Sequence, residues 1–220
     1  MSSLNRRRHL LPEMEGRTAR WYARQRGTPS QLATVRRQAA ELTGSMASGE
    51  VLEVAPGPGY LAIEIARHGL RVTGLDISRT MVEISQENAA AAGVAVEFRR
   101  GDATAMPFVD QSFDLIVCQA AFKNFRQPVS ALNEMHRVLR PGGRAVIQDL
   151  RKEAARSDID REVDNQNLGA VSRFITKRVL AWLRARAYSA TQLERLVAES
   201  RFRVCEIKTD GIGLEVQLKK

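Results

Sequence analysis

Short apolar runs alternate along this chain with stretches in which apolar residues recur every three or four positions. The apolar runs are predicted strands: residues 51–54, 71–75, 95–99, 113–118 and 144–148. The stretches with helical spacing are predicted helices: residues 30–43, 59–68, 79–92 and 128–139. Ser78 is a suitable N-cap for the third of these helices and Gly93 a suitable C-cap. In a chain of 220 residues, this order of elements fits one α/β domain.

The last third of the chain has a different pattern. Residues 149–188 are polar at first and then basic and helical, so we expect helices that lie over the open end of the sheet. Ser189 and Gln192 fit a capping box for one more helix. Residues 202–208 and 212–218 alternate around a turn signal, which predicts a terminal antiparallel hairpin.

The most informative segment is Val51–Gly59, in which an apolar strand that carries Glu53 breaks into a Gly57-x-Gly59 turn before a helix. A glycine turn lets a ligand approach the backbone closely, and N–H groups at the helix start point at it. The next strand ends in Asp76, about twenty residues after the turn, where a carboxylate reaches ribose hydroxyls. A nucleoside-type cofactor is therefore predicted. Its identity stays open here, because Gly57-x-Gly59-x-x-Ala62 followed by Asp76 also fits a dinucleotide site.

Three segments narrow the choice of cofactor. They are Glu53-Val-Ala-Pro-Gly-Pro-Gly59, Gly101-Asp-Ala103 with Met106-Pro-Phe108, and Arg137-Val-Leu-Arg-Pro-Gly-Gly143. Together they resemble the class I, seven-stranded S-adenosylmethionine-dependent methyltransferases, in particular the small-molecule group typified by the ubiquinone/menaquinone-biosynthesis C-methyltransferases. The resemblance is strong over roughly residues 50–150. One departure is Ala55, which stands where the family usually has glycine.

The resemblance implies a Rossmann-like, doubly wound α/β fold: a mostly parallel seven-stranded sheet with a C-terminal antiparallel hairpin and helices on both faces. It also implies transfer of a methyl group from S-adenosyl-L-methionine to a small organic acceptor by in-line displacement, with S-adenosyl-L-homocysteine as product. The positions carried over as cofactor contacts are Glu53, Ala55, Gly57, Gly59, Asp76, Ile77, Met81, Asp102, Ala103 and Gln119. Glu53 and the glycine turn are expected at the methionine part, and Asp76 at both ribose hydroxyls. Asp102 and the Ala103 backbone are expected at the adenine.

The acceptor side carries less signal. Tyr22 is a candidate to close over the methionine carboxylate, as N-terminal aromatics do in related enzymes; packing with Trp21 is the alternative. Lys123 and His136 are weak catalytic candidates, for which a surface lysine and a structural histidine are the simpler interpretations. No residue stands out as a general base. We expect residues 1–45 to form a basic helical lid and residues 46–220 the cofactor-binding domain, with a helical insertion at about 151–188.

The formal net charge of +9 is concentrated in the N-terminal forty residues. Such an excess attracts polyanions but indicates no chemistry. A specific RNA methyltransferase is disfavoured, because the Asn/Asp-Pro-Pro-aromatic signature is absent after the fourth strand. An NAD(P)-dependent oxidoreductase is disfavoured by the lack of a Tyr-x-x-x-Lys pair. A non-catalytic cofactor-binding module remains as an alternative.

Neither a membrane span nor a metal site is expected from the sequence. The apolar runs fall short of the roughly twenty residues that cross a bilayer. No His/Cys cluster has metal-ligand spacing, and Cys118 and Cys205 fit buried small hydrophobes in a reducing cytoplasm. We therefore expect a cytoplasmic protein with a small-molecule acceptor and no specific nucleic-acid partner. The sequence leaves a homodimer open.

Overall fold

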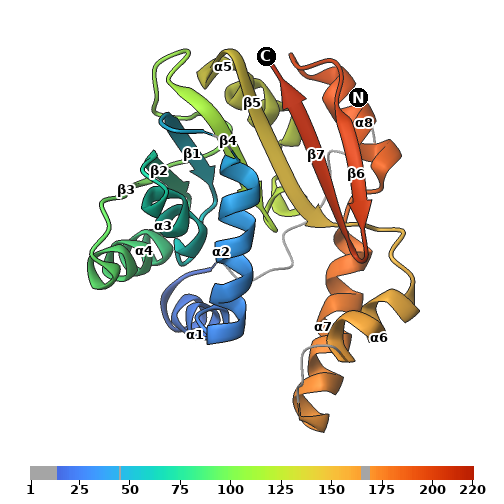
Figure 1. Cartoon of the computed structure of the whole chain (residues 1–220). Helices are drawn as coiled ribbons and strands as arrows, with labels where there is room; N and C mark the ends of the chain where they lie inside the picture. Colours follow the sequence, from blue (N-terminus) through green and yellow to red (C-terminus); the bar gives the residue numbers. More distant parts are fainter. Residues whose placement is uncertain (1–13, 45, 165–168) are drawn as a thin grey trace.

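The computed structural model describes residues 14–44, 46–164 and 169–220 of the chain. Its centre is a seven-stranded sheet with the order β3-β2-β1-β4-β5-β7-β6. The strands are β1 (Glu50–Val54), β2 (Arg71–Asp76), β3 (Glu97–Arg100), β4 (Phe113–Gln119), β5 (Leu139–Leu150), β6 (Glu206–Asp210) and β7 (Gly213–Lys219). The first five strands in this order, from β3 to β5, are parallel to their neighbours. Strand β7 is antiparallel to both β5 and β6. The predicted sheet with its C-terminal antiparallel hairpin is confirmed (Figure 1).

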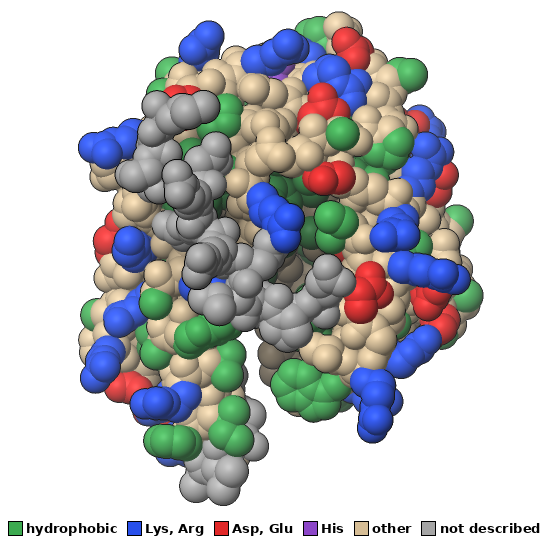
Figure 2. All heavy atoms as spheres, turned by 180° about the vertical axis from the view of Figure 1, so that it is seen from behind, with side chains coloured by type: hydrophobic (Ala, Val, Ile, Leu, Met, Phe, Trp, Pro, Cys, Tyr) green, Lys and Arg blue, Asp and Glu red, His purple; other side chains and the backbone are tan. Residues whose placement is uncertain are grey.

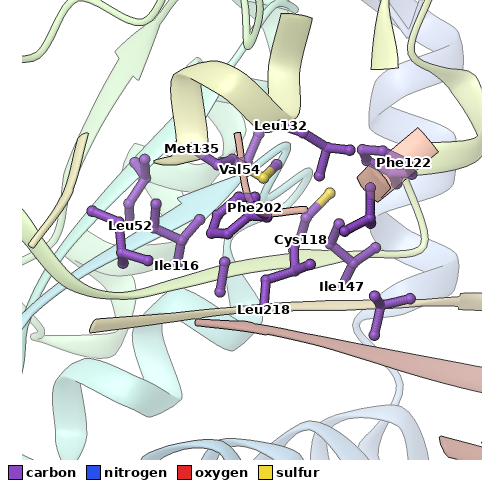
Figure 3. Packing of buried hydrophobic residues seen from close by; sticks show 14 of the residues in the cluster. Leu52, Val54, Ile116, Cys118, Phe122, Leu132, Met135, Ile147, Phe202 and Leu218 are labelled. Atoms are coloured by element: carbon purple, nitrogen blue, oxygen red, sulfur yellow. The ribbon is translucent and has the colours of Figure 1, made fainter. Parts of the chain in front are cut away.

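Helices cover both faces of the sheet, because the strands are apolar on both sides. The helices are α1 (Gly16–Arg26), α2 (Pro29–Thr43), α3 (Tyr60–Arg67), α4 (Arg79–Ala92), α5 (Pro128–Val138), α6 (Arg156–Asp164), α7 (Ala170–Arg186) and α8 (Ala190–Glu199), with a 3-10 turn at Phe122–Asn124. Alternate residues of β1 belong to different cores. Leu52 packs with Leu132 of α5 and Leu193 of α8 in one cluster, part of which Figure 3 shows. Val51 packs with α2 and α3 in the other cluster.

Local sequence signals placed most helix ends correctly. The Ser78 hydroxyl accepts the Met81 N–H at 3.0 Å, and Gly93 ends α4 with a φ of 65°. Ser189 and Gln192 form the predicted capping box of α8. The starts of two strands differ most from the prediction. Strand β5 begins at Leu139 and not at Arg144. Strand β6 begins at Glu206 and not at Phe202, because Phe202 is buried between α5 and α8, where its ring meets His136 edge-on.

Two helical parts project from the end of the sheet where the parallel strands finish. One is α1, which lies in the segment predicted as a helical lid although its bounds were not predicted, and the other is the α6–α7 hairpin (Figure 1). They stand on either side of the carboxyl ends of β1 and β4. In the part of the chain that the structure describes, no helix is long and apolar enough to cross a membrane.

Candidate functional site

Strands β1 and β4 diverge at their carboxyl ends, and we call the place between them the crevice. The two strands pair as far as Glu53 and Val117. Beyond that pair the Ala55 N–H donates to the Leu75 carbonyl of β2 at 2.8 Å, whereas the Ala120 N–H donates to the Gln148 carbonyl of β5 at 2.7 Å. The backbone after β1 thus stays with β2, and the backbone after β4 stays with β5. This divergence is the topological switch point of the sheet, where open α/β proteins bind ligands.

The two glycines of the turn between β1 and α3 have different tasks. Both have positive φ, 54° at Gly57 and 79° at Gly59. A Cβ on Gly59 would lie 2.8 Å from both Phe98 and Ser85, so this glycine allows the turn to pack on β3 and α4. A Cβ on Gly57 would meet only Tyr22 Cε1, at 3.9 Å. Gly57 is therefore the residue whose missing side chain leaves room at the crevice.

Asp76 ends β2 beside this turn and is 7% exposed. Its Oδ2 accepts the Gly57 N–H at 3.1 Å and its Oδ1 accepts the Ser78 N–H at 2.9 Å. Burial raises the pKa of Asp76, and the two backbone donors oppose that effect. Each carboxylate oxygen has two lone pairs, so each can accept one more hydrogen bond. The next residue, Ile77, is a 66% exposed apolar side chain.

Glu53 is the least satisfied group near the crevice. It is 3% exposed in β1, and its Oε2 has no hydrogen-bond partner among the residues that the structure describes. Burial raises the pKa of Glu53 to about 8; the Ala62 amide opposes the shift and the charge of Asp76 adds to it. The carboxyl group therefore holds a proton at neutral pH. A cation placed against it would supply the missing partner and favour the carboxylate.

The other predicted cofactor contacts lie along the same edge of the sheet. Asp102 follows β3, and its Oδ1 accepts the Thr104 N–H at 2.8 Å and the Thr104 hydroxyl at 2.9 Å. Ala103 is next to it and half-buried. Gln119 ends β4, and its Nε2 donates to Gln148 Oε1 at 3.0 Å. The structure thus brings the ends of β1, β2, β3 and β4 together at one edge.

Tyr22 reaches this edge from α1, which Glu15 fastens to the core. Glu15 accepts the backbone N–H groups of Arg79 and Thr80 at 2.8 and 3.0 Å, at the start of α4. Met81 is 2% exposed and packs among the α1 and α4 side chains, so it supports α1 and does not line an open surface. No local sequence signal pointed to Glu15, because its partners are 64 and 65 residues away.

Lys123 is not the surface lysine that its simpler interpretation assumed. Its side chain is 5% exposed, and its Nζ lies 2.7 Å from Asp149 Oδ1 and 2.5 Å from the Ala120 carbonyl. Asp149 also accepts the Lys123 N–H at 3.0 Å. This buried pair fixes the loop after β4 against the end of β5. Asp149 was not among the predicted site residues. It could have been found, because it is an acid that directly follows the predicted strand 144–148.

His136 is not brought to this edge. It lies on α5, the helix that leads into the start of β5, and its ring meets Phe202 at 5.1 Å. Burial lowers the pKa of His136, and the charges of Lys220 and Arg201 act in the same direction. Lys220 binds the backbone carbonyls of Arg137 and Leu139, at the opposite end of the sheet from the crevice. The position of His136 indicates a packing role.

Comparisons with known proteins agree with this architecture. Residues 52–147 match the methyltransferase domain family. A demethylmenaquinone methyltransferase from Thermus thermophilus is 39% identical over 114 residues, which cover 51% of this chain and 52% of that protein. The chain spans about half the length of the curated relatives it matches.

Solved structures extend the likeness to the whole fold. A candidate S-adenosylmethionine-dependent methyltransferase from Methanococcus maripaludis has a TM-score of 0.72 at 22% identity and covers 97% of both chains. The [4+2]-cyclase SpnF has a TM-score of 0.59 at 24% identity, over 80% of this chain and 57% of its own. Likeness at such identities shows the fold. A cyclase among these proteins means that the fold alone does not fix the reaction.

Proposed function

We propose that this chain is a class I S-adenosylmethionine-dependent methyltransferase that binds S-adenosylmethionine in the crevice between β1 and β4. The match of residues 52–147 to the methyltransferase domain family supports the proposal. It transfers the methyl group to a small organic acceptor and releases S-adenosylhomocysteine. The observation that carries the proposal is that two buried acids lie at this edge of the sheet: Asp76, which has acceptor positions to spare, and Glu53, whose Oε2 has no hydrogen-bond partner among the described residues.

The chemistry of these residues fits such a cofactor. A ribose offers two adjacent hydroxyl donors, and Asp76 has one remaining acceptor position on each oxygen. An amino-acid ammonium is a cation, and Glu53 lacks one. Adenine needs an apolar platform, and the exposed Ile77 side chain follows Asp76 directly. Asp102 and Ala103 would contact the edge of the adenine ring. Gln119 and Ala55 would contact the methionine part of the cofactor, and Tyr22 would cover the methionine carboxylate.

When bound, the cofactor supplies an electrophilic methyl group on a sulfonium, whose departure needs no proton. The tasks of this chain are therefore to position the reactants and to exclude water. Helix α1 carries Tyr22 over the glycine turn and is held there by Glu15. The Lys123–Asp149 pair sets the path of the loop after β4, which follows Gln119 directly. We assign Lys123 a positioning role and no proton transfer.

The acceptor is the least constrained part of this proposal. The Thermus thermophilus relative is named for demethylmenaquinone, so a compound with a quinone ring is the first acceptor to test. Because the chain covers only half of that protein, phenol, amine and thiol acceptors belong in the same panel.

The test is transfer of label from methyl-labelled S-adenosylmethionine to this acceptor panel. The proposal predicts labelled product with at least one acceptor and loss of product in Asp76→Asn. A thermal-shift comparison separates the alternatives: S-adenosylhomocysteine raises the melting temperature and NAD(P)H does not. Stabilisation by S-adenosylhomocysteine without transfer to any acceptor would favour a non-catalytic cofactor-binding module. Stabilisation by NAD(P)H alone would favour the oxidoreductase.

A further inference from the structure

Helix α7 has one face that nothing in the described structure covers. This face carries the four exposed large apolar side chains of the helix: Phe174, Ile175, Val179 and Trp182, which are 67, 54, 47 and 45% exposed. Residues 175, 179 and 182 are spaced by four and three, so they lie on one side of the helix. We call these four residues, together with Arg178, the outer face of α7. An exposed apolar stripe of this kind marks an interaction surface.

The opposite side of α7 is held to α6 by ion pairs. Lys177 Nζ lies 3.0 Å from Asp160 and 3.1 Å from Asp164, and Arg173 lies 3.6 Å from Asp164. The acidic residues of these pairs all belong to α6, because α7 contains five basic residues and no acidic one. The hairpin is therefore supported from within, and the outer face does not serve to hold it together.

Cationic side chains accompany the apolar ones. Arg178 is exposed on the outer face, and the Arg186 guanidinium lies 5.3 Å from the centre of the Trp182 ring. At the same end of the molecule, α1 carries four arginines and the 62% exposed Trp21. In the space-filling view, the α6–α7 hairpin is the projecting lobe at the lower left, with hydrophobic and basic side chains on its surface (Figure 2).

We propose that the outer face of α7 docks this protein onto an anionic lipid membrane. Basic helices with tryptophan, phenylalanine and aliphatic residues on one face lie in the plane of a bilayer surface, with the apolar side chains at the boundary between headgroups and acyl chains. Arginine can place its aliphatic stem among those side chains while its guanidinium meets lipid phosphate. The hairpin projects beyond the body of the domain (Figure 1), so α7 can approach a flat surface.

Charge and shape favour a membrane over other occupants. A symmetric contact with a second copy would set two α7 faces together, each with arginines and no acid on that helix, which is unfavourable. A nucleic acid would use the arginines but would leave Ile175 and Val179 without an apolar partner. An anionic bilayer satisfies both kinds of side chain.

Vesicle flotation tests the proposal, with the full chain and no methyl donor, so the result is independent of the proposed enzymatic function. Vesicles of phosphatidylcholine alone are compared with vesicles that also contain phosphatidylglycerol. The wild type should float with the anionic vesicles, at least about tenfold more tightly than with the neutral ones, and salt should weaken the binding. Equal binding to both vesicles, or to neither, would overturn the proposal.

Matched variants locate the contact. Phe174→Ser with Trp182→Ser should weaken anionic-vesicle binding by about tenfold or more, and Arg178→Glu should weaken it as well. Val109→Ser with Val204→Ser removes two side chains that are 79 and 77% exposed elsewhere, and should leave binding unchanged. In a Trp21→Phe background Trp182 is the remaining tryptophan of the two in the chain, and its emission should shift to the blue with anionic vesicles.

Two results would contradict this location. One is unchanged vesicle binding by the Phe174→Ser/Trp182→Ser variant when its thermal melt matches that of the wild type. The other is a concentration-dependent dimer of the wild type, measured by sedimentation, that the same variant abolishes; that outcome would assign the face to a second copy of the chain.

Discussion

Ala55 and Ala120 follow adjacent strands, β1 and β4, and both have left-handed backbone conformations, with φ of 59° and 56°. Their N–H groups bond in opposite directions, Ala55 to β2 and Ala120 to β5. The crevice between the two strands depends on this divergence. A non-glycine residue in the left-handed region costs roughly 1–2 kcal/mol, so the mouth of the crevice is a strained part of the backbone.

This strain makes the size of the side chain at position 55 critical. Ala55→Val should lower the free energy of unfolding by about 2 kcal/mol or more, because a β-branched residue is a genuine outlier at positive φ. Ala55→Gly should change it by less than about 1 kcal/mol, because relief of strain is offset by the flexibility of glycine. Chemical denaturation measures both. Ala90→Val, at an exposed position of α4, is the control and should cost less than about 1 kcal/mol. Equal costs for the two valine variants would contradict the strain.

Glu53→Gln should have opposite effects on stability and on cofactor binding. Between pH 4.5 and about 8, the folded Glu53 carboxyl group holds a proton that the unfolded one has released. The free energy of unfolding therefore falls as the pH rises through this range, by roughly 1.4 kcal/mol per pH unit from this group. Glu53→Gln should remove that slope and stabilise the free protein at pH 8. The exposed Glu97→Gln is the control.

The same variant should weaken binding of S-adenosylhomocysteine, because glutamine cannot become the anion that an ammonium needs. Binding to the wild type at pH 7 should release a proton. Calorimetry in two buffers with different ionisation enthalpies detects that release, and Glu53→Gln should abolish the difference between the buffers. A wild-type binding enthalpy that is independent of the buffer would rule out this role for Glu53.

The Lys123–Asp149 pair should matter more to stability than a surface ion pair does. Lys123→Met leaves a buried carboxylate without its cation, so we expect a loss of about 3 kcal/mol or more in the free energy of unfolding. Adding Asp149→Asn should recover part of that loss, since it removes the unpaired charge and its amide oxygen can still accept one of the two backbone N–H groups, that of residue 123 or that of Leu150. A double-mutant cycle gives the coupling directly. Additive losses would mean that the pair contributes no coupling.

Glu15 should act as the attachment of α1. Hydrogen bonding to Thr80 is the largest cause that lowers the pKa of Glu15, and burial opposes it. The stabilisation is therefore present at neutral pH and is lost as the pH falls through that lowered pKa. The hydrogen-exchange protection factors of α1, which correct for the pH dependence of intrinsic exchange, should fall at low pH, and Glu15→Gln should show faster exchange in α1 at pH 7. Exchange in α3 serves as the internal control; unchanged exchange in α1 would contradict the role of Glu15.

The sequence predicted those parts of the molecule that depend on local pattern. Strands β1, β2 and β4, the glycine turn and the Ser78 cap follow from apolar runs and capping residues close together in the chain. The interactions that the sequence did not predict connect distant residues. Glu15 meets Thr80, and Lys123 meets Asp149, through contacts that only the folded sheet brings together. The bounds of helix α1 within the predicted helical lid were not found, because its buried side is made of small residues, Ala19 and Ala23.

Calorimetric titration of S-adenosylhomocysteine into the wild type and into Asp76→Asn tests the central claim most directly. Asparagine keeps the size of the side chain and one oxygen acceptor. This oxygen can hold the Gly57 N–H, while the acceptor of the Ser78 N–H and the charged acceptor of the ribose hydroxyls are lost. The account predicts one site per chain in the wild type and binding weaker by about tenfold or more in Asp76→Asn, with both proteins equally folded by circular dichroism. Failure of the wild type to bind, or the same affinity in the variant, would contradict the assignment of the crevice to this cofactor.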